Sequence, residues 1–310
     1  MQKIPLGKSS LVTSRLAYGC WRIANSGDDA LDTRVARTAV ETAVECGYTL
    51  FDLADIYCRG RSEIVFGQAL RQLPGLRSQI IIATKCGIRF ADEPSAGAPF
   101  RYDFSAEHIA ASCEQSLRRL GIETIDVYQL HRPDWLMNAE EVATAFAKLK
   151  KEGKVREFGV SNFSPSQVSL LQQACDSALL VNQVEISLLQ LSTFTDGTLD
   201  QCQAQKMTPL AWSPLGGGLL GEGAASLLPS QKSYRPVAVI AELDRISLDR
   251  GVTRTAVALA WLLLHPAGIV PIVGSTQPDR IRVSATAANV QLSREEWYRL
   301  LEAARGEQLP

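Results

Sequence analysis

Short β-like runs of five or six residues recur along the whole chain and alternate with longer segments of helical periodicity. The eight runs are RLAYG (15–19), YTLFD (48–52), IIIAT (80–84), IDVYQL (125–130), VREFGV (155–160), LLVNQ (179–183), PLAWS (209–213) and GIVPIV (268–273). Strands that alternate with helices favour a parallel sheet with right-handed crossovers. Eight such units predict an α/β fold of the (β/α)8 TIM-barrel class, with residues 1–310 forming a single domain.

The segments between these runs carry the start and stop signals of helices. Residues 33–47 place apolar side chains on one helical face and end at Gly47, a residue typical of helix C-termini. Residues 105–121 begin at a capping Ser105 and end at Gly121. Further helices are predicted over 138–154, 164–175 (with a capping box of Ser164 and Gln167), 237–251 and 253–265. Ahead of the first unit, residues 3–14 predict an N-terminal β-hairpin that closes the bottom of the barrel.

Composition narrows the class of protein. The net charge of −1 gives no basic excess for nucleic acid, and no apolar run reaches the 18 residues of a membrane helix. The seven cysteines form no C-x-x-C pair, and the three histidines lack the spacing of zinc ligands. We therefore expect a cytoplasmic protein with reduced thiols, no metal site, no nucleic-acid partner and no membrane partner.

The sequence GGGLLG (216–221) matches the G-x-G-x-x-G fingerprint of dinucleotide-binding Rossmann domains. That fingerprint opens a helix after the first strand of its unit. Here it follows the seventh predicted strand, and the next helical pattern starts only near residue 237. We interpret residues 213–221 instead as a loop beside the pyrophosphate of a nucleotide bound to the barrel.

Residues at the carboxyl ends of barrel strands form the active site in this fold class. Four residues at or just after such ends are Asp52, Tyr57, Lys85 and His131. Any one of them alone is compatible with a structural role, but together they can form an acid relay. A lysine ammonium is expected to lower the pKa of a nearby tyrosine, an aspartate keeps the lysine charged, and a neutral imidazole can orient a carbonyl oxygen. Such a site protonates an oxygen while a cofactor supplies hydride to carbon.

Five segments also carry a resemblance to a known family. They are FDLADIY (51–57), ATKCG (83–87), YQLHRPD (128–134), GKVREFGVSNFSPSQV (153–168) and VNQVEIS (181–187). In this order they resemble the aldo-keto reductase superfamily over the whole chain, and HRPD and SNFSP resemble its bacterial oxidoreductase branch. The resemblance implies reduction of an aldehyde or ketone to an alcohol, with Tyr57 as general acid. It further implies that Lys85 and Asp52 tune Tyr57 and that His131 orients the substrate.

The same resemblance implies NADPH as the cofactor. Ser161 and Asn162 would hold the nicotinamide carboxamide, and we expect both to be free because Ser164 already caps the next helix. Donors at 274–276 precede a helix N-terminus and suit an anion, and Arg280 could pair with the 2′-phosphate. The full set of expected cofactor residues is Gly19, Cys20, Trp21, Ser161, Asn162, Gln183, Trp212, Ser213, Leu215, Gly217, Gly274, Ser275, Thr276 and Arg280.

The expected substrate pocket consists of Trp21, Cys58, Phe90 and Arg132, with 89–104 as a loop at the mouth. We expect a monomer that acts on a small carbonyl or alcohol compound. Two other functions are compatible with the sequence. One is a nucleotide-binding regulatory subunit with little turnover. The other is a glycosidase barrel, which needs paired carboxylates and would have to use Asp52 and Glu185.

Overall fold

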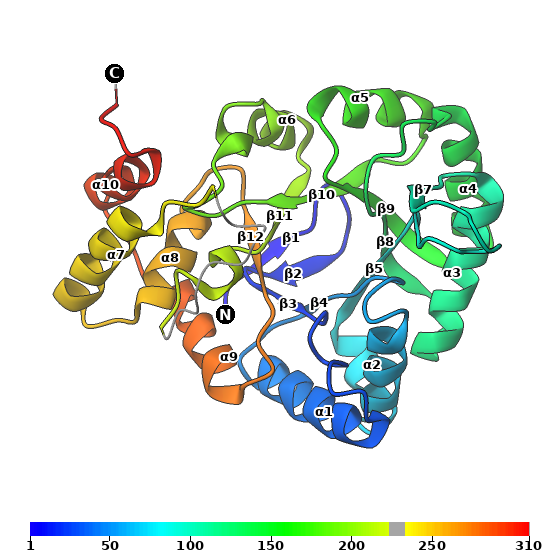
Figure 1. Ribbon diagram of the computed structural model, residues 1–310, viewed down its shortest axis with the longest axis horizontal. Coiled ribbons are helices and arrows are strands. Elements are labelled where there is room, and N and C mark those ends of the chain that lie inside the picture. Colours follow the sequence, from blue (N-terminus) through cyan, green and yellow to red (C-terminus); the bar gives the residue numbers. More distant parts are fainter. Residues whose placement is uncertain (223–232, 310) are drawn as a thin grey trace.

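Eight parallel strands form a closed barrel in the computed structural model, which describes residues 1–222 and 233–309 (Figure 1). In order around the wall they are β3 (Ala17–Gly19), β4 (Leu50–Asp52), β5 (Ile81–Cys86), β8 (Ile125–Leu130), β9 (Val155–Ser161), β10 (Leu179–Glu185), β11 (Thr208–Trp212) and β12 (Val270–Val273). Strand β12 pairs with β3 and so closes the ring. Each predicted run overlaps one of these strands, and the predicted (β/α)8 barrel is confirmed.

Helices cover the outside of the barrel (Figure 1). They are α1 (Asp29–Glu45), α2 (Arg61–Arg71), α3 (Ala106–Leu120), α4 (Ala139–Lys151), α5 (Pro165–Ala174), α6 (Thr198–Gln205), α7 (Pro236–Arg250), α8 (Arg254–Leu263), α9 (Pro278–Ala285) and α10 (Arg294–Arg305). Short 3-10 turns occupy Leu76–Gln79, Ser192–Phe194, Gly216–Gly218 and Thr286–Asn289. Helices α7 and α10 pack against each other at one side of the barrel, outside the repeating β/α pattern.

The predicted helix caps are present. Ser105 Oγ accepts a hydrogen bond from the backbone N–H of His108. Ser164 and Gln167 form the reciprocal capping box of α5. Helix α1 begins earlier than the predicted residue 33, because the Asp28 side chain accepts bonds from the first free N–H groups of the helix.

The N-terminal hairpin consists of β1 (Lys3–Pro5) and β2 (Val12–Ser14) and lies across the amino ends of the barrel strands (Figure 1). Its turn residue Leu6 is fully buried in the apolar cluster that fills the barrel, together with Leu50 and Leu210. Gly7 N–H donates to Thr208 Oγ1 at 2.9 Å. A side chain at Gly7 would approach the Leu180 carbonyl oxygen to 2.8 Å, so this close approach requires glycine. The hairpin therefore closes the bottom of the barrel, as predicted.

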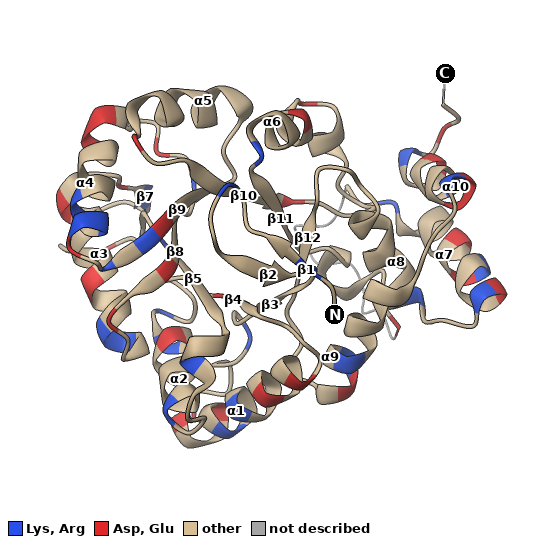
Figure 2. Cartoon of the chain, turned by 180° about the vertical axis from the view of Figure 1, so that it is seen from behind, with Lys and Arg blue, Asp and Glu red and all other residues tan. Residues whose placement is uncertain are grey.

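A second hairpin lies at the opposite end, between β5 and α3. Its strands β6 (Ile88–Arg89) and β7 (Arg101–Tyr102) are antiparallel and lie within the segment expected to form the mouth loop. Charged residues of both signs are mixed over the outer helices, whereas the barrel strands carry few of them (Figure 2). Among the described residues, no helix is both long and apolar enough to span a bilayer.

Candidate active site

The carboxyl ends of β4 and β5 bring three of the predicted residues together. Lys85 Nζ donates to Asp52 Oδ2 at 2.8 Å and to the Tyr57 hydroxyl oxygen at 3.1 Å. It also donates to the Leu53 carbonyl oxygen at 2.6 Å, and its side chain is fully buried. The ammonium group is therefore fixed between a carboxylate and a phenol, as the relay hypothesis requires.

His131 completes the group from the end of β8. Its ring lies edge-on to the Tyr57 ring, with centroids 5.9 Å apart. The exposed Trp21 ring also lies near Tyr57, with the two ring centroids 6.2 Å apart. All three residues line a cavity of about 650 Å³.

Burial has the largest effect on the pKa of Tyr57 and raises it, and the Lys85 charge offsets only part of that effect. The net lowering that the sequence suggested is therefore wrong. The free-energy cost of removing a phenolate from water exceeds the stabilisation that the nearby ammonium provides. At neutral pH the phenol keeps its proton, which is the form that a proton donor needs.

Burial acts in the same direction on the pKa of Lys85 and of His131, but the neighbouring charges make the net shifts opposite. Burial alone would lower the pKa of Lys85, but Asp52 and then Tyr57 raise it, so the net direction is upward. The pKa of His131 lies well below its usual value, because burial comes first and the Lys85 and Arg132 charges act in the same direction. The imidazole is thus neutral at pH 7, as expected. Its Nδ1 is buried without a hydrogen-bond partner among the described residues.

Most of the predicted residues line the cavity. Those that do are Gly19, Trp21, Asp52, Tyr57, Phe90, His131, Arg132, Ser161, Asn162, Gln183, Trp212, Ser213, Leu215, Gly217, Gly274, Ser275 and Arg280. The cavity runs from the Tyr57 end across the barrel mouth to α9. One continuous space therefore connects the relay with the expected phosphate-binding segment.

Asn162 and Ser161 are less free than the sequence suggested. Asn162 Nδ2 donates to the His131 carbonyl oxygen and to Ser161 Oγ, and Trp212 Nε1 donates to Asn162 Oδ1. Ser161 Oγ in turn donates to the Gln183 carbonyl oxygen. The capping role of Ser164 was predicted correctly, but it does not leave these two side chains unbonded. Instead they form a network that fixes the Trp212 ring in the cavity wall.

At the far end of the cavity, helix α9 begins with Pro278 after the N-cap residue Gln277, which makes no side-chain cap bond. Arg280 in its first turn is exposed and forms no ion pair with a described residue. The neighbouring Asp279 accepts a bond from Arg282 at 3.3 Å. This end of the cavity therefore combines the N-terminus of α9 with a guanidinium that has no ion-pair partner in the described part of the chain, an arrangement that suits an anion.

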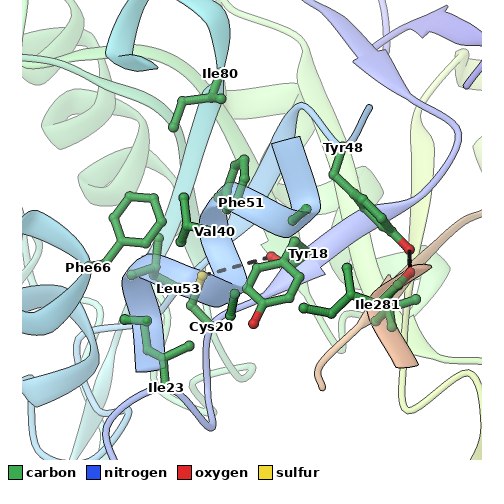
Figure 3. Close-up of a cluster of buried hydrophobic side chains, with 14 of the residues drawn as sticks. Tyr18, Cys20, Ile23, Val40, Tyr48, Phe51, Leu53, Phe66, Ile80 and Ile281 are labelled. Carbon is green, nitrogen blue, oxygen red and sulfur yellow. Dashed lines mark hydrogen bonds between the residues drawn. The ribbon is translucent and has the colours of Figure 1, made fainter. Parts of the chain in front are cut away.

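Four predicted residues lie outside the cavity lining. Cys20 is fully buried, and its thiol points into an apolar cluster that includes Ile23, Leu53 and Phe66 (Figure 3). The Cys58 thiol donates to Asn25 Oδ1 at 3.3 Å, and neither residue lines the cavity. Thr276 follows Ser275 but does not reach the cavity. Lys85 also stays behind the wall, in contact with Tyr57.

Other lining residues escaped the sequence analysis. Arg22 follows Trp21, and its guanidinium carbon lies 6.0 Å from the Trp21 ring. Glu222 accepts bonds from the Thr255 backbone N–H and hydroxyl at the start of α8. The further residues that were not named as site residues are Ile56, Ile88, Thr253, Ile272, Val273, Asp279, Val283 and Ser284, whereas Pro214, Gly218 and Gly221 lie in the predicted loop 213–221. Of these residues, only Arg22 could have been found from the sequence, because it is a basic residue directly after Trp21, which had been assigned to the pocket.

The GGGLLG segment forms a 3-10 turn over Gly216–Gly218 rather than the first turn of an α-helix. Gly217 adopts a φ of 69° and Gly218 a φ of 105°, which are accessible to glycine at little cost. Except for Gly216, residues 213–218 line the cavity, and Gly221 does so as well. The fold therefore excludes a Rossmann domain. Residues 223–232, which belong to the stretch predicted to lack a helix before residue 237, lie outside the described residues.

The glycosidase alternative fails on geometry. Asp52 is bound by Lys85 and by Gln183 Nε2, and Glu185 accepts a hydrogen bond from the Tyr234 hydroxyl. Neither carboxylate is available as an acid or nucleophile. In the described part of the chain, no cluster of His, Cys, Asp and Glu side chains is arranged to hold a metal ion.

A profile of the Aldo/keto reductase family matches residues 15–305. The chain belongs to this family. A 6-dehydroglucose reductase from Agrobacterium fabrum is 44% identical over 312 residues that cover 100% of both chains. A 6-dehydroglucose reductase from Novosphingobium aromaticivorans is 40% identical over 311 residues, covering 98% of this chain and 96% of the relative. Among solved structures, the glycerol dehydrogenase AKR11B4 from Gluconobacter oxydans matches with a TM-score of 0.85 at 28% identity, covering 99% and 97% of the two chains.

Family membership sets the general chemistry of this aldo-keto reductase. It is an oxidoreductase that acts on carbonyl and alcohol groups of small molecules and uses a nicotinamide cofactor. The cavity between the relay and α9 is the place where both ligands would have to meet.

Proposed function

We propose that this aldo-keto reductase reduces an aldehyde or ketone to an alcohol with NADPH, and that Tyr57 is the general acid. The observation that carries the proposal is the bond from Lys85 Nζ to the Tyr57 oxygen at 3.1 Å, backed by Asp52 at 2.8 Å. A phenol that faces the cavity and is anchored to a buried ammonium can donate a proton and then hold the resulting negative charge.

The residues divide the work as follows. The neutral His131 donates to the carbonyl oxygen and orients it toward Tyr57. Bound NADPH supplies the hydride that reaches the carbonyl carbon. As charge develops on the oxygen, Tyr57 transfers its proton there, and the phenolate that remains is stabilised by the Lys85 ammonium. Asp52 keeps that ammonium charged, since it is buried and would otherwise lose its proton.

The described residues fit the proposed cofactor. Trp212 is fixed by Asn162 and presents an aromatic face to the cavity, suited to stack on a nicotinamide ring. Gly274, Ser275 and the start of α9 lie at the other end with Arg280. The unpaired Arg280 guanidinium supports NADPH over NADH, because it can bind a 2′-phosphate through two parallel hydrogen bonds.

For the substrate, we propose a polyhydroxylated aldehyde related to 6-dehydroglucose. Two relatives that the chain covers almost end to end carry the name 6-dehydroglucose reductase. The pocket offers the Trp21 ring as a flat apolar surface, with Phe90 on the hairpin side and Arg132 beside His131. We further propose that residues 1–310 act as one domain and as a cytoplasmic monomer; the seven free thiols support a reducing compartment.

The test is to follow NADPH absorbance with purified protein and a panel of sugar-derived, short-chain and aromatic aldehydes. The expected result is turnover of at least the sugar-derived aldehydes, at higher kcat/KM with NADPH than with NADH. Tight nucleotide binding without turnover of any aldehyde would contradict the proposal and would favour the regulatory-subunit alternative. Light scattering after gel filtration tests the monomer.

A further inference from the structure

We propose that Arg132 selects the substrate, by donating hydrogen bonds to oxygen acceptors that the substrate carries close to its carbonyl group. The substrate class is thus an oxygen-rich aldehyde or ketone, with hydroxyl or carboxylate groups near the reacting carbon. This inference rests on the proposed function, since it assumes that the carbonyl is held between Tyr57 and His131.

Arg132 lies next to the residue that is proposed to orient the carbonyl group. It directly follows His131 at the end of β8, and it lines the same cavity. Consecutive Cα atoms are about 3.8 Å apart, so a carbonyl oriented by His131 has its neighbouring carbons within reach of the Arg132 side chain.

The Arg132 guanidinium is positioned by an aromatic ring, but its hydrogen-bond donors have no partner among the described residues. Its guanidinium carbon lies 5.6 Å from the Trp212 ring, which Asn162 fixes by a 3.0 Å hydrogen bond. Such a cation–π contact positions the guanidinium without using its donors. No described residue forms an ion pair or hydrogen bond with it.

The neighbouring charged groups do not balance the positive charge of Arg132. Lys85 and Asp52 form an ion pair with each other, His131 is uncharged, and no acidic side chain among the described residues forms an ion pair with Arg132. The cavity lining also includes the apolar residues Ile56, Ile88 and Phe90, none of which has a side-chain acceptor. Arginine has five donors and no acceptor, so a complementary ligand must bring oxygen acceptors.

The experiment compares three aldehydes of similar length: a simple alkyl aldehyde, a polyhydroxylated aldehyde and an aldehyde that carries a carboxylate. Each is assayed with the wild type, Arg132→Met, Arg132→Lys and the control Arg37→Met. Arg37 lies on the outer face of α1 in an exposed pair with Glu41, so it offers the same substitution away from the cavity.

The readout is the ratio of kcat/KM for each oxygenated aldehyde to kcat/KM for the alkyl aldehyde. Within one variant this ratio cancels changes in folding and in cofactor binding. We expect Arg132→Met to lower the ratio about tenfold or more, mainly through KM, as for loss of a charge-assisted hydrogen bond. Arg132→Lys should recover part of it, and Arg37→Met should leave it unchanged.

The oxygenated aldehyde with the larger drop identifies the natural acceptor as hydroxyl or carboxylate. A ratio that stays within twofold in Arg132→Met for both oxygenated aldehydes would overturn this inference, while wild-type turnover would leave the proposed function standing. No wild-type turnover of any aldehyde would instead refute the proposed function.

Discussion

Replacing Asp52 by Asn removes the counter-ion of Lys85 while keeping nearly the same side-chain shape. The Asn Oδ1 can still accept the bond from Gln183 Nε2, which is 2.7 Å from Asp52 Oδ1. The amide nitrogen would then face Lys85 Nζ, so two donors would meet at the position of the present 2.8 Å ion pair. Lys85 would keep only the Leu53 carbonyl and the Tyr57 hydroxyl as partners.

The expected loss of stability follows from burial, because Lys85 is fully buried and Asp52 nearly so. Breaking a buried ion pair by removing one partner costs about 3–5 kcal/mol. For a chain of 310 residues, the entropy of unfolding near 60 °C is about 0.65 kcal/mol per kelvin. The variant should therefore melt about 5–8 °C below the wild type. Its kcat should fall about 100-fold or more, because an ammonium without its carboxylate stabilises the Tyr57 phenolate less well.

Calorimetry and steady-state kinetics measure the two effects, and Asp126→Asn is the matched control. Asp126 is also buried and paired, with Arg77 at 2.9 Å and Arg156 at 3.1 Å, but it lies at the amino end of β8. We expect the control to lose less stability, because Arg77 and Arg156 are partly exposed and stay solvated, and to keep kcat within about twofold. An Asp52→Asn variant that retained both its melting temperature and its kcat would refute the reasoning.

Three further predictions concern other parts of the molecule. Arg280→Met should raise KM for NADPH about tenfold or more while KM for NADH changes less than twofold, since one charge-assisted contact to the 2′-phosphate is lost; equal effects on both cofactors would contradict this. Asp55 has a carboxylate oxygen buried without a partner among the described residues, and burial followed by Glu63 raises its pKa to about 8. The folded protein then binds a proton that the unfolded chain releases above about pH 4, so this site's contribution to stability falls as pH rises from about 4 to 8. Asp55→Asn should accordingly melt slightly above the wild type at pH 5 and further above it at pH 8.5, and a gain that shrinks with rising pH would be incompatible with the assignment. Arg59 lies 4.3 Å from the Phe90 ring and joins the Tyr57 loop to the β6–β7 hairpin; Arg59→Met should raise substrate KM a few-fold with kcat nearly unchanged, and a loss confined to kcat would argue against this link.

The barrel could be predicted from the sequence because each strand is a compact apolar run, but several helices could not. Helix α2 begins after Gly60 without a side-chain cap and buries the polar residues Ser62 and Glu63, so neither the start signal nor the apolar periodicity is visible. Helix α6 likewise begins after a glycine without a cap bond. Helix α10 is different, since its capping box of Ser293 and Glu296 can be read directly from the sequence.

The relay could be predicted because strand ends in a barrel converge on one mouth, whatever the intervening sequence. The net pKa of Tyr57 could not, since it depends on how much water burial removes, and that is a property of the assembled pocket. The bonds of Asn162 to Trp212 and the His131 carbonyl join residues from three different strands. Neighbours that are distant in sequence leave no local signal.

The central claim is that Tyr57 supplies the proton, and Tyr57→Phe tests it most directly. The substitution removes one oxygen atom and keeps the ring that contacts both Trp21 and His131. The measurement is kcat for a reduced aldehyde, together with the NADPH dissociation constant from fluorescence titration of the same preparation. We predict that kcat falls at least 100-fold while the dissociation constant changes less than threefold. A variant that binds NADPH normally and reduces the aldehyde at the wild-type rate would contradict the account.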